Sequence, residues 1–163
     1  FSEIIWRSER DGWNHLYLYD GRTGKVKYQI TKGEWVVREV VEVNEEKRQI
    51  TFKASGREPG IDPYYFHYYR VNFDGSNLVK LTDGNGTHSV RFSPDKSVLI
   101  DTWSRVDQPP HHTLRSAEDG SLLCELEEAD AEDLFAAGFQ LPERFVAKDR
   151  DGKYDIHGII TIS

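Results

Sequence analysis

Apolar and polar residues alternate along this chain in a unit that recurs three times. Each copy begins with a histidine and a short alternating run, continues through an Asp-Gly turn, and ends in a second short run. Alternation predicts strands with one buried face, and an Asp-Gly turn between two such strands predicts a β-hairpin. The three copies occupy residues 15–30, 67–81 and 112–126, with turns at Asp20-Gly21, Asp74-Gly75 and Asp119-Gly120.

The spacing of these copies predicts a β-propeller. The leading histidines, His15, His67 and His112, lie 52 and then 45 residues apart. A repeat of about 40–50 residues built from short strands is typical of propeller blades, each of which buries its faces against its neighbours. About two and a half blades do not close a ring. We therefore expect the sequence to be a piece of a larger propeller.

Further strands complete the blades beside these hairpins. The run at residues 36–43 is β-branched and partly alternating, as expected of an inner strand with one face on a core. Gly and Pro predict a loop at residues 55–63, and Pro109-Pro110 predicts its counterpart at residues 107–110. We predict strands at residues 2–7, 15–19, 26–30, 36–43, 49–53, 66–73, 78–81, 88–92, 98–103, 112–115 and 122–126.

The pattern changes after residue 126. Residues 130–137 are rich in helix formers and acidic at their start, and Gly138 suits the end of a helix. Two further runs, at residues 144–148 and 154–162, predict a last hairpin. The predicted fold is mainly all-β, a partial β-propeller with four-stranded antiparallel blades. It has an incomplete blade at residues 1–31, complete blades at 32–83 and 84–126, and a helix and exit hairpin at 127–163.

Composition excludes several classes of function. The 163 residues include eight Tyr, eight Phe and four Trp, which suits sheets packed on sheets. The formal net charge is −7 and Lys and Arg form no cluster, so nucleic acid is not an expected partner. No apolar stretch approaches the ~18 residues of a membrane span, so we expect no membrane insertion by this segment. Cys124 is the only cysteine, and we expect a small buried hydrophobic side chain there.

No catalytic residue, metal site or cofactor is predicted. A hydrolase of the α/β class needs its nucleophile in a Gly-x-Ser-x-Gly turn, and no serine here has that context. Adjacent strand residues point to opposite faces, so His111-His112 with His88 does not predict zinc. Residues 83–87 begin like a calcium loop, but Pro94 stands where the bidentate Glu belongs.

We expect structural roles for the leading histidines of the repeat and for the aromatic residues. His15, His67 and His112 occupy equivalent places in the repeat, and we expect them to join blade to blade through hydrogen bonds. The run Tyr-Tyr-Phe-His-Tyr-Tyr at residues 64–69 could form a stacking platform, but core packing is the preferred interpretation. Trp35 lies between the last strand of one blade and the first of the next, where a large ring fills the wedge between sheets.

Several segments in a fixed order carry a family resemblance. They are Glu-Arg-Asp-Gly-Trp-Asn-His-Leu-Tyr at residues 9–17, Gln-Ile-Thr-Lys-Gly-Glu-Trp-Val at 29–36, His-Tyr-Tyr-Arg-Val-Asn-Phe-Asp-Gly at 67–75 and Phe-Ser-Pro-Asp at 92–95. Together they resemble the N-terminal β-propeller of dipeptidyl peptidase IV-like members of the prolyl oligopeptidase family. Residues 101–110 and 145–158 resemble its last blade and the entry into its catalytic domain.

The resemblance implies an eight-bladed propeller followed by an α/β-hydrolase domain with a Ser-Asp-His triad. Such enzymes remove N-terminal dipeptides and prefer Pro or Ala in the second position. A glutamate pair on an early-blade helix holds the substrate amino group; Glu45-Glu46 and Glu127-Glu128 do not match that motif and are interpreted as solvated charge. No substrate-binding residue is therefore assigned. The family also suggests a periplasmic or extracytoplasmic location.

Two functions follow from this sequence. The first is a non-catalytic propeller part of a serine exopeptidase that gates access to the active site. Its partners would be the absent hydrolase domain, the remaining blades and the peptide substrate of the parent enzyme. The alternative is a stand-alone propeller-type protein-binding module. The closing helix and hairpin favour the first, because a self-sufficient propeller returns its chain to close the ring. Exposed blade faces predict self-association in either case.

Overall fold

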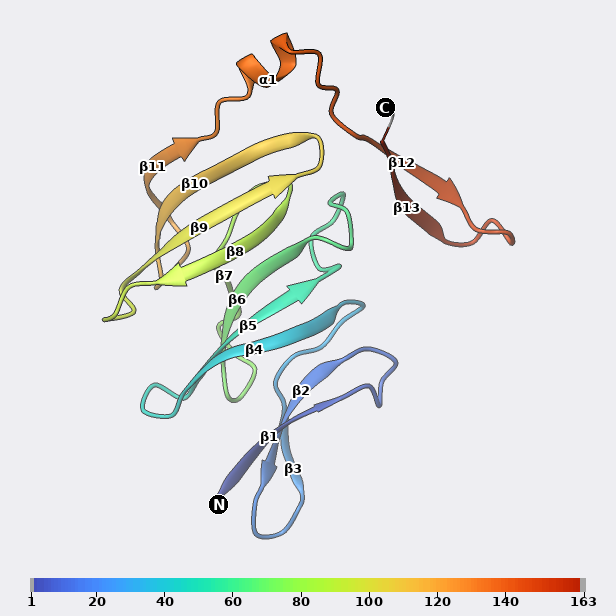
Figure 1. Cartoon of the computed structure of the whole chain (residues 1–163). Coiled ribbons are helices and arrows are strands. Elements are labelled where there is room, and N and C mark those ends of the chain that lie inside the picture. Colours follow the sequence, from blue (N-terminus) through green and yellow to red (C-terminus); the bar gives the residue numbers. More distant parts are fainter. Residues whose placement is uncertain (1, 162–163) are drawn as a thin grey trace.

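Three antiparallel sheets follow one another along the chain in the computed structural model, which describes residues 2–161 (Figure 1). The first sheet contains β1 (Glu3–Ser8), β2 (His15–Asp20) and β3 (Val26–Gln29). The second contains β4 (Val36–Asn44), β5 (Gln49–Ser55), β6 (Phe66–Asn72) and β7 (Val79–Lys80). The third contains β8 (Thr87–Phe92), β9 (Val98–Arg105), β10 (Gln108–Ser116) and β11 (Leu122–Glu128).

A short helix and a separate hairpin follow the third sheet. The helix α1 spans Glu132–Ala136, and the hairpin pairs β12 (Glu143–Lys148) with β13 (Asp155–Ile160). Gly138 ends the helix with a φ of 93°, a conformation that glycine adopts without strain. In Figure 1 the hairpin stands to one side of the three sheets.

The structure is a partial β-propeller, as the sequence predicted. Both four-stranded sheets run in chain order from β4 to β7 and from β8 to β11. The leading histidines of the repeat start β2 and lie in β6, so β1, β2 and β3 correspond to β5, β6 and β7. Within residues 2–161 the first sheet therefore has no counterpart of β4 or β8.

Most predicted element bounds lie within two residues of those observed. The exception is β10, which begins at Gln108 and includes Pro109-Pro110, where the sequence predicts a loop. The two prolines lie where the pairing of β10 with β9 shifts, between Gln108 and His111. Their missing N–H groups are therefore not needed for that ladder. The predicted end of the last strand at residue 162 lies outside the described residues.

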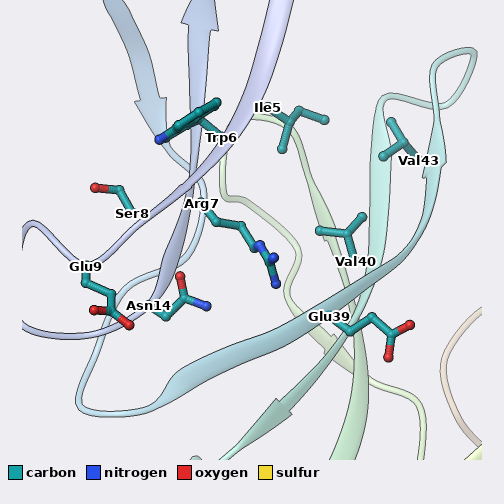
Figure 2. Close-up of a pocket in the computed structure, with 9 residues that line it drawn as sticks. All are labelled: Ile5, Trp6, Arg7, Ser8, Glu9, Asn14, Glu39, Val40 and Val43. Carbon is teal, nitrogen blue, oxygen red and sulfur yellow. The ribbon is translucent and has the colours of Figure 1, made fainter.

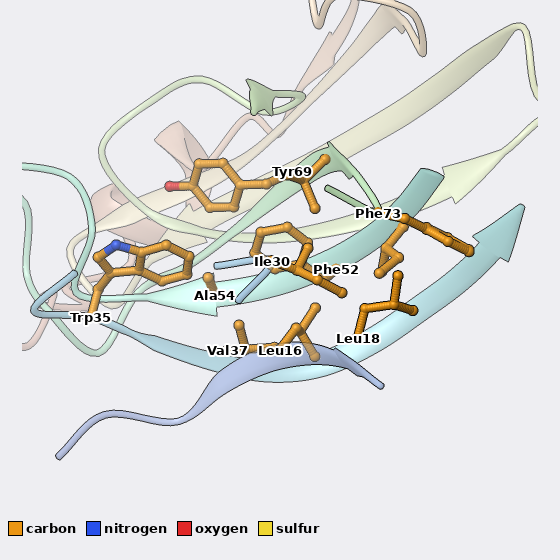
Figure 3. Close-up of a cluster of buried hydrophobic side chains, with 11 residues drawn as sticks. Leu16, Leu18, Ile30, Trp35, Val37, Phe52, Ala54, Tyr69 and Phe73 are labelled. Carbon is orange, nitrogen blue, oxygen red and sulfur yellow. The ribbon is translucent and has the colours of Figure 1, made fainter. Parts of the chain in front are cut away.

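The main core lies between the first and second sheets. Leu16 and Leu18 of β2 pack against side chains of the second sheet that include Val37, Phe52 and Tyr69, all of them buried. Figure 3 shows these side chains as one layer between the sheets, with Trp35 at one end and Phe73 at the other. Such a dry layer of interdigitated side chains is what makes neighbouring blades cohere.

A smaller core joins the second and third sheets. Tyr68 and Leu81 from the second sheet pack with Leu99 and Ala117 from the third. Tyr68 and Tyr69 are adjacent in β6 and so point to opposite faces, each contributing to a different core. The second sheet is thus buried on both faces, as an internal blade should be.

Trp35 fills the wedge predicted for it at the first junction. Its ring is stacked on Phe52 with centroids 6.1 Å apart, and the edge of His15 meets it at 4.8 Å. Gly33 lies against the Trp35 ring: a Cβ added at Gly33 would come within 2.6 Å of the indole nitrogen. At the second junction the large ring is Trp103 of β9, which covers Gly84 and Gly86 in the same way.

One prediction about burial is wrong and another is confirmed only in part. Cys124 is exposed rather than buried, because all of β11 is exposed and no further sheet covers it within the described residues. The aromatic run at residues 64–69 is only partly core: Tyr68 and Tyr69 are buried, but Tyr64 is 64% exposed. Tyr64 precedes β6, so the alternation that buries the later tyrosines does not reach it.

Two of the three leading histidines contact the segment that connects their own sheet to the next one. His15 Nδ1 lies 3.0 Å from Thr31 Oγ1, and its Nε2 lies 2.8 Å from the Gly33 carbonyl oxygen. His67 repeats the first contact with Thr82 Oγ1, at 3.2 Å. His112 instead contacts Thr102 Oγ1 on the neighbouring strand β9, so the prediction of a third equivalent is wrong.

Candidate functional site

Five ionisable side chains connect the terminal hairpin to the second and third sheets. We call them the rim cluster: Asp62 from the loop after β5, Arg105 at the end of β9, Asp107 from the turn after β9, Arg144 from β12 and His157 from β13. His157 Nδ1 lies 3.4 Å from Asp62 Oδ2, and Arg144 Nη2 lies 3.7 Å from the same oxygen. Arg144 Nη1 also lies 3.9 Å from Asp107 Oδ2, and Arg105 Nε donates to Asp107 Oδ1 at 2.8 Å. The cluster thus joins three segments distant in sequence.

Local structure explains how both sides of the rim cluster are presented. Asp62 precedes Pro63 in a turn, and its Oδ1 accepts the N–H of Tyr64 at 2.9 Å, which fixes the carboxylate. On the hairpin, Val146 is opposite His157 and shares a strand face with Arg144. Arg144 and His157 are therefore diagonal neighbours on one face of the hairpin, directed at one carboxylate.

A cavity of about 390 Å³ lies beside the rim cluster. Its walls are mostly apolar and aromatic, and include Tyr64, Tyr65, Val106 and Ile159 together with Asp62. The guanidinium of Arg144 lies 5.2 Å from the centre of the Tyr65 ring, and burial raises the pKa of the Tyr65 hydroxyl. No serine, cysteine or lysine is among the described lining residues, so this cavity lacks the nucleophiles of serine and cysteine peptidases.

A second candidate site is an open groove between the first two sheets, which we call the β1 groove. It has a volume of about 900 Å³ and runs between β1 and β4. Figure 2 shows Arg7 directed from β1 toward β4, where its Nη1 donates to the Arg38 carbonyl oxygen at 3.0 Å. Among residues 2–161, β1 pairs only with β2 and β4 only with β5. Each strand therefore offers unpaired backbone groups to an extended segment.

His88, His111 and His112, which the sequence does not predict to bind zinc, each contact a different side chain in the structure. His111 stacks on Trp103 at 4.5 Å, His112 contacts Thr102, and His88 is buried beside Asp101. The part of the chain that the structure describes contains no group of three or more His, Cys, Asp or Glu side chains placed to bind a metal ion.

Sequence reasoning missed a buried trio of ionisable side chains in the third sheet. His88 Nδ1 lies 2.8 Å from Asp101 Oδ1, and Arg115 Nε lies 3.3 Å from Asp101 Oδ2. Both His88 and Asp101 side chains are fully buried, so this His–Asp pair has no access for a substrate. Alternation could have shown that these positions face inward, but not that three strands bring the charges together.

Both acidic pairs lie in solvent, as predicted. Glu45 and Glu46 are exposed in the turn between β4 and β5, and Glu127 and Glu128 are exposed at the end of β11. Among the residues that the structure describes, the only ion-pair partner of these four carboxylates is His111, 3.5 Å from Glu128. In residues 2–161 no helix is long and apolar enough to cross a membrane.

Comparison with known proteins identifies the family. A model of the family described as "Dipeptidyl peptidase IV (DPP IV) N-terminal region" matches residues 1–110, which run from the first sheet into β10. The chain belongs to this family. The resemblance read from the sequence is therefore confirmed, and the partial propeller is a dipeptidyl peptidase IV-type N-terminal region.

Curated relatives agree with this assignment. "Probable dipeptidyl-aminopeptidase B" of Aspergillus oryzae is 35% identical over 101 residues, which cover 61% of this chain and 11% of the relative. "Probable dipeptidyl peptidase 4" of Aspergillus flavus is 28% identical over 104 residues, which cover 63% of this chain and 13% of the relative. The chain thus spans about a tenth of the length of these dipeptidyl peptidase IV-type relatives.

A solved structure has the same fold. A protein of Bacteroides ovatus ATCC 8483, described as a "putative dipeptidyl aminopeptidase IV", superposes with a TM-score of 0.72 at 26% identity. The match covers 96% of this chain and 24% of that one. It therefore includes nearly all the elements described here, whereas the family model ends at residue 110.

Proposed function

We propose that this chain is part of the β-propeller of a dipeptidyl peptidase IV-like serine exopeptidase, which releases N-terminal dipeptides and prefers Pro or Ala in the second position. The observation that carries the proposal is the family match over residues 1–110, which reaches all three sheets. The 35% identity with a relative named as a dipeptidyl-aminopeptidase supports the same activity for the parent enzyme.

Within that enzyme the chain is a non-catalytic scaffold that limits access to the active site. No serine of this sequence lies in a Gly-x-Ser-x-Gly turn, so the nucleophile belongs to the hydrolase domain. The buried His88–Asp101 pair stabilises a blade junction and takes no part in catalysis. The proposed domains of this scaffold are three blades, at residues 1–31, 32–83 and 84–126, and a hairpin segment at residues 127–163.

The hairpin segment is the proposed packing surface for the hydrolase domain. A two-stranded sheet alone is at best marginally stable in water, yet β12 and β13 expose Phe145, Ile156 and Ile160 on the face opposite Arg144 and His157. The rim cluster fixes one face of the hairpin on the blades. A partner domain on the exposed apolar side chains gives the hairpin the second contact that it needs.

The β1 groove and the outer face of β11 are proposed contacts for the remaining blades of the parent. Both expose apolar side chains, including Trp6 in the groove and Leu123 on β11. In the isolated chain the same surfaces favour self-association. The peptide substrate belongs to the parent enzyme, and no residue here is assigned to it.

The experiment compares the purified chain with the longer polypeptide from which it comes, using Xaa-Pro and Xaa-Ala dipeptides that carry a chromogenic leaving group. We expect turnover by the longer polypeptide and none by the chain. A nucleophile elbow normally supports rate accelerations of about 10⁶-fold or more, and this sequence has none. Release by the chain that a serine-directed inhibitor abolishes would overturn the scaffold assignment, and an inactive longer polypeptide would overturn the exopeptidase assignment.

A further inference from the structure

The connection between the second and third sheets is fixed by side chains of the third sheet. This blade link, residues 82–86, joins β7 to β8. Three consecutive carbonyl oxygens in it face nitrogen atoms of the next sheet. Asp83 O accepts from Arg115 Nη2 at 3.4 Å, Gly84 O lies 3.3 Å from His88 Nε2, and Asn85 O accepts from Arg105 Nη1 at 3.2 Å. The path of this backbone therefore determines the position at which β8 begins.

Asn85 is the chemically vulnerable position of the blade link. It is exposed, and its carboxamide makes no hydrogen bond within residues 2–161, although its main-chain oxygen does. The next residue is Gly86, whose lack of a Cβ leaves its amide nitrogen accessible to the asparagine side chain. The other four asparagines precede bulkier residues: His15, Glu45, Phe73 and Leu78.

We propose that Asn85 is a site of spontaneous deamidation that loosens the junction between the second and third sheets. The Gly86 nitrogen attacks Cγ of Asn85, a C–N bond forms, and ammonia leaves with the side-chain nitrogen. Water then opens the cyclic imide at one of its two carbonyl carbons. Opening at one carbon gives aspartate, and opening at the other gives isoaspartate, whose main chain runs through the former side chain.

Either product disturbs the blade link. Isoaspartate adds one methylene to the main chain between Asn85 and Gly86, so the three carbonyl oxygens can no longer all meet their partners. Aspartate and isoaspartate both place a new carboxylate two residues from Asp83, in a chain of net charge −7. The charge of Asp83 repels this carboxylate, and in isoaspartate the longer main chain also displaces the oxygen that accepts from Arg105.

The fold itself slows the reaction. Gly86 is packed so closely that an added Cβ would lie 2.7 Å from the Ser104 carbonyl oxygen and 2.9 Å from the Trp103 ring. Ring closure requires the backbone at Asn85 and Gly86 to rotate, and this packing opposes that rotation. We therefore expect conversion in the folded chain, but more slowly than in the denatured chain.

The test is an ageing series on the purified chain at mildly alkaline pH, followed by peptide mapping with mass spectrometry and enzymatic labelling of isoaspartate. We expect a mass gain of about one dalton in the peptide that contains Asn85. Asn14, Asn44, Asn72 and Asn77 serve as internal controls and should convert several-fold more slowly. Asn85→Gln should abolish the gain in that peptide.

Hydrogen exchange on the same samples tests the structural consequence. In the aged chain, amides of β8 should exchange faster than in fresh protein, whereas amides of β2 should not change. An aged Asn85→Gln sample should keep the fresh exchange pattern. Conversion at Asn85 no faster than at the other asparagines overturns the site, and conversion without faster exchange in β8 overturns its effect on the junction.

Discussion

Trp35 shows at the residue scale how one side chain organises a junction between blades. Its ring contacts Phe52 and His15 from two different sheets and is 7% exposed. Trp35→Ala should lower the free energy of unfolding by about 3–5 kcal/mol, because it removes a large buried surface and leaves a cavity. Chemical denaturation of the variant and the parent chain measures this difference.

The matched control is Trp13→Ala. Trp13 lies in the turn between β1 and β2 and is 39% exposed, so its loss should cost less than about 1 kcal/mol. Equal losses in the two variants would show that the indole of Trp35 contributes no more than a surface ring.

His67 gives the protein a stability that depends on pH. Burial, reinforced by the charge of His88, lowers the pKa of His67 from 6.5 to about 3. The folded chain therefore keeps this ring neutral at pH values where the unfolded chain binds a proton. The resulting stability is fully present above pH 6.5 and is lost as the pH falls from 6.5 toward about 3.

Urea denaturation across this pH interval tests the sign. The midpoint should fall steadily with acidification, and His67→Gln should reduce the slope. Carboxylates in the turns affect stability at lower pH than His67 does. Hydrogen bonds from Ser93 and Ser97 lower the pKa of Asp95 from 3.8 to about 2. A midpoint that stays constant until the pH reaches 3.8 would assign the acid sensitivity to these turns and not to His67.

At the scale of elements, the terminal hairpin depends on one carboxylate. Asp62 faces both Arg144 and His157, and its side chain is only 11% exposed. Asp62→Asn removes the charge that both partners share, so the hairpin should separate more often from the blades at a cost of about 1 kcal/mol. Hydrogen exchange in β12 and β13 should therefore accelerate.

Asp155→Asn provides the control for that experiment. Asp155 pairs with Lys148 inside the hairpin, 2.6 Å away, and both side chains are at least half exposed. Its loss should leave the contact with the blades intact and change exchange less than Asp62→Asn does. The reverse order would mean that the hairpin is stabilised mainly from within.

Strands and turns were largely predictable because their causes are local. Alternation at residues 15–19 and an Asp-Gly turn suffice to place β2 and the hairpin that follows it. Pro109-Pro110 predicts a loop because proline usually ends a strand, whereas here the shift in register with β9 leaves both prolines outside the paired positions. The rim cluster could not be predicted from the sequence, because no sequence pattern links Asp62 to side chains more than 80 residues away.

Burial was predicted well only where both neighbouring sheets are present. Tyr69 and Trp35 are buried between two blades; alternation marks the position of Tyr69, and the place between two blades marks that of Trp35. Cys124 has apolar neighbours in a strand, so the same reasoning predicted burial there. Exposure of that strand depends on whether another sheet covers it, which is a property of the assembled molecule and not of residues 122–126.

At the scale of the whole molecule, the open edge of β1 and the outer face of β11 predict self-association. Light scattering over a wide dilution series should give a mass that rises with concentration. Trp6 is 59% exposed on β1, and Trp6→Lys should shift the rise to higher concentration, because an edge charge opposes strand pairing. Trp13→Lys, outside the strand, is the control. A constant monomeric mass would contradict the prediction.

The His15–Thr31 and His67–Thr82 contacts also bear on how the chain folds during synthesis. Their partners are only 16 and 15 residues apart, so each contact can form soon after its strand leaves the ribosome. Low sequence separation favours rapid formation of structure, and domains fold from the N-terminus as they emerge. We therefore expect each connection to form before the contacts between sheets, so that the blades assemble in the order in which they are synthesised.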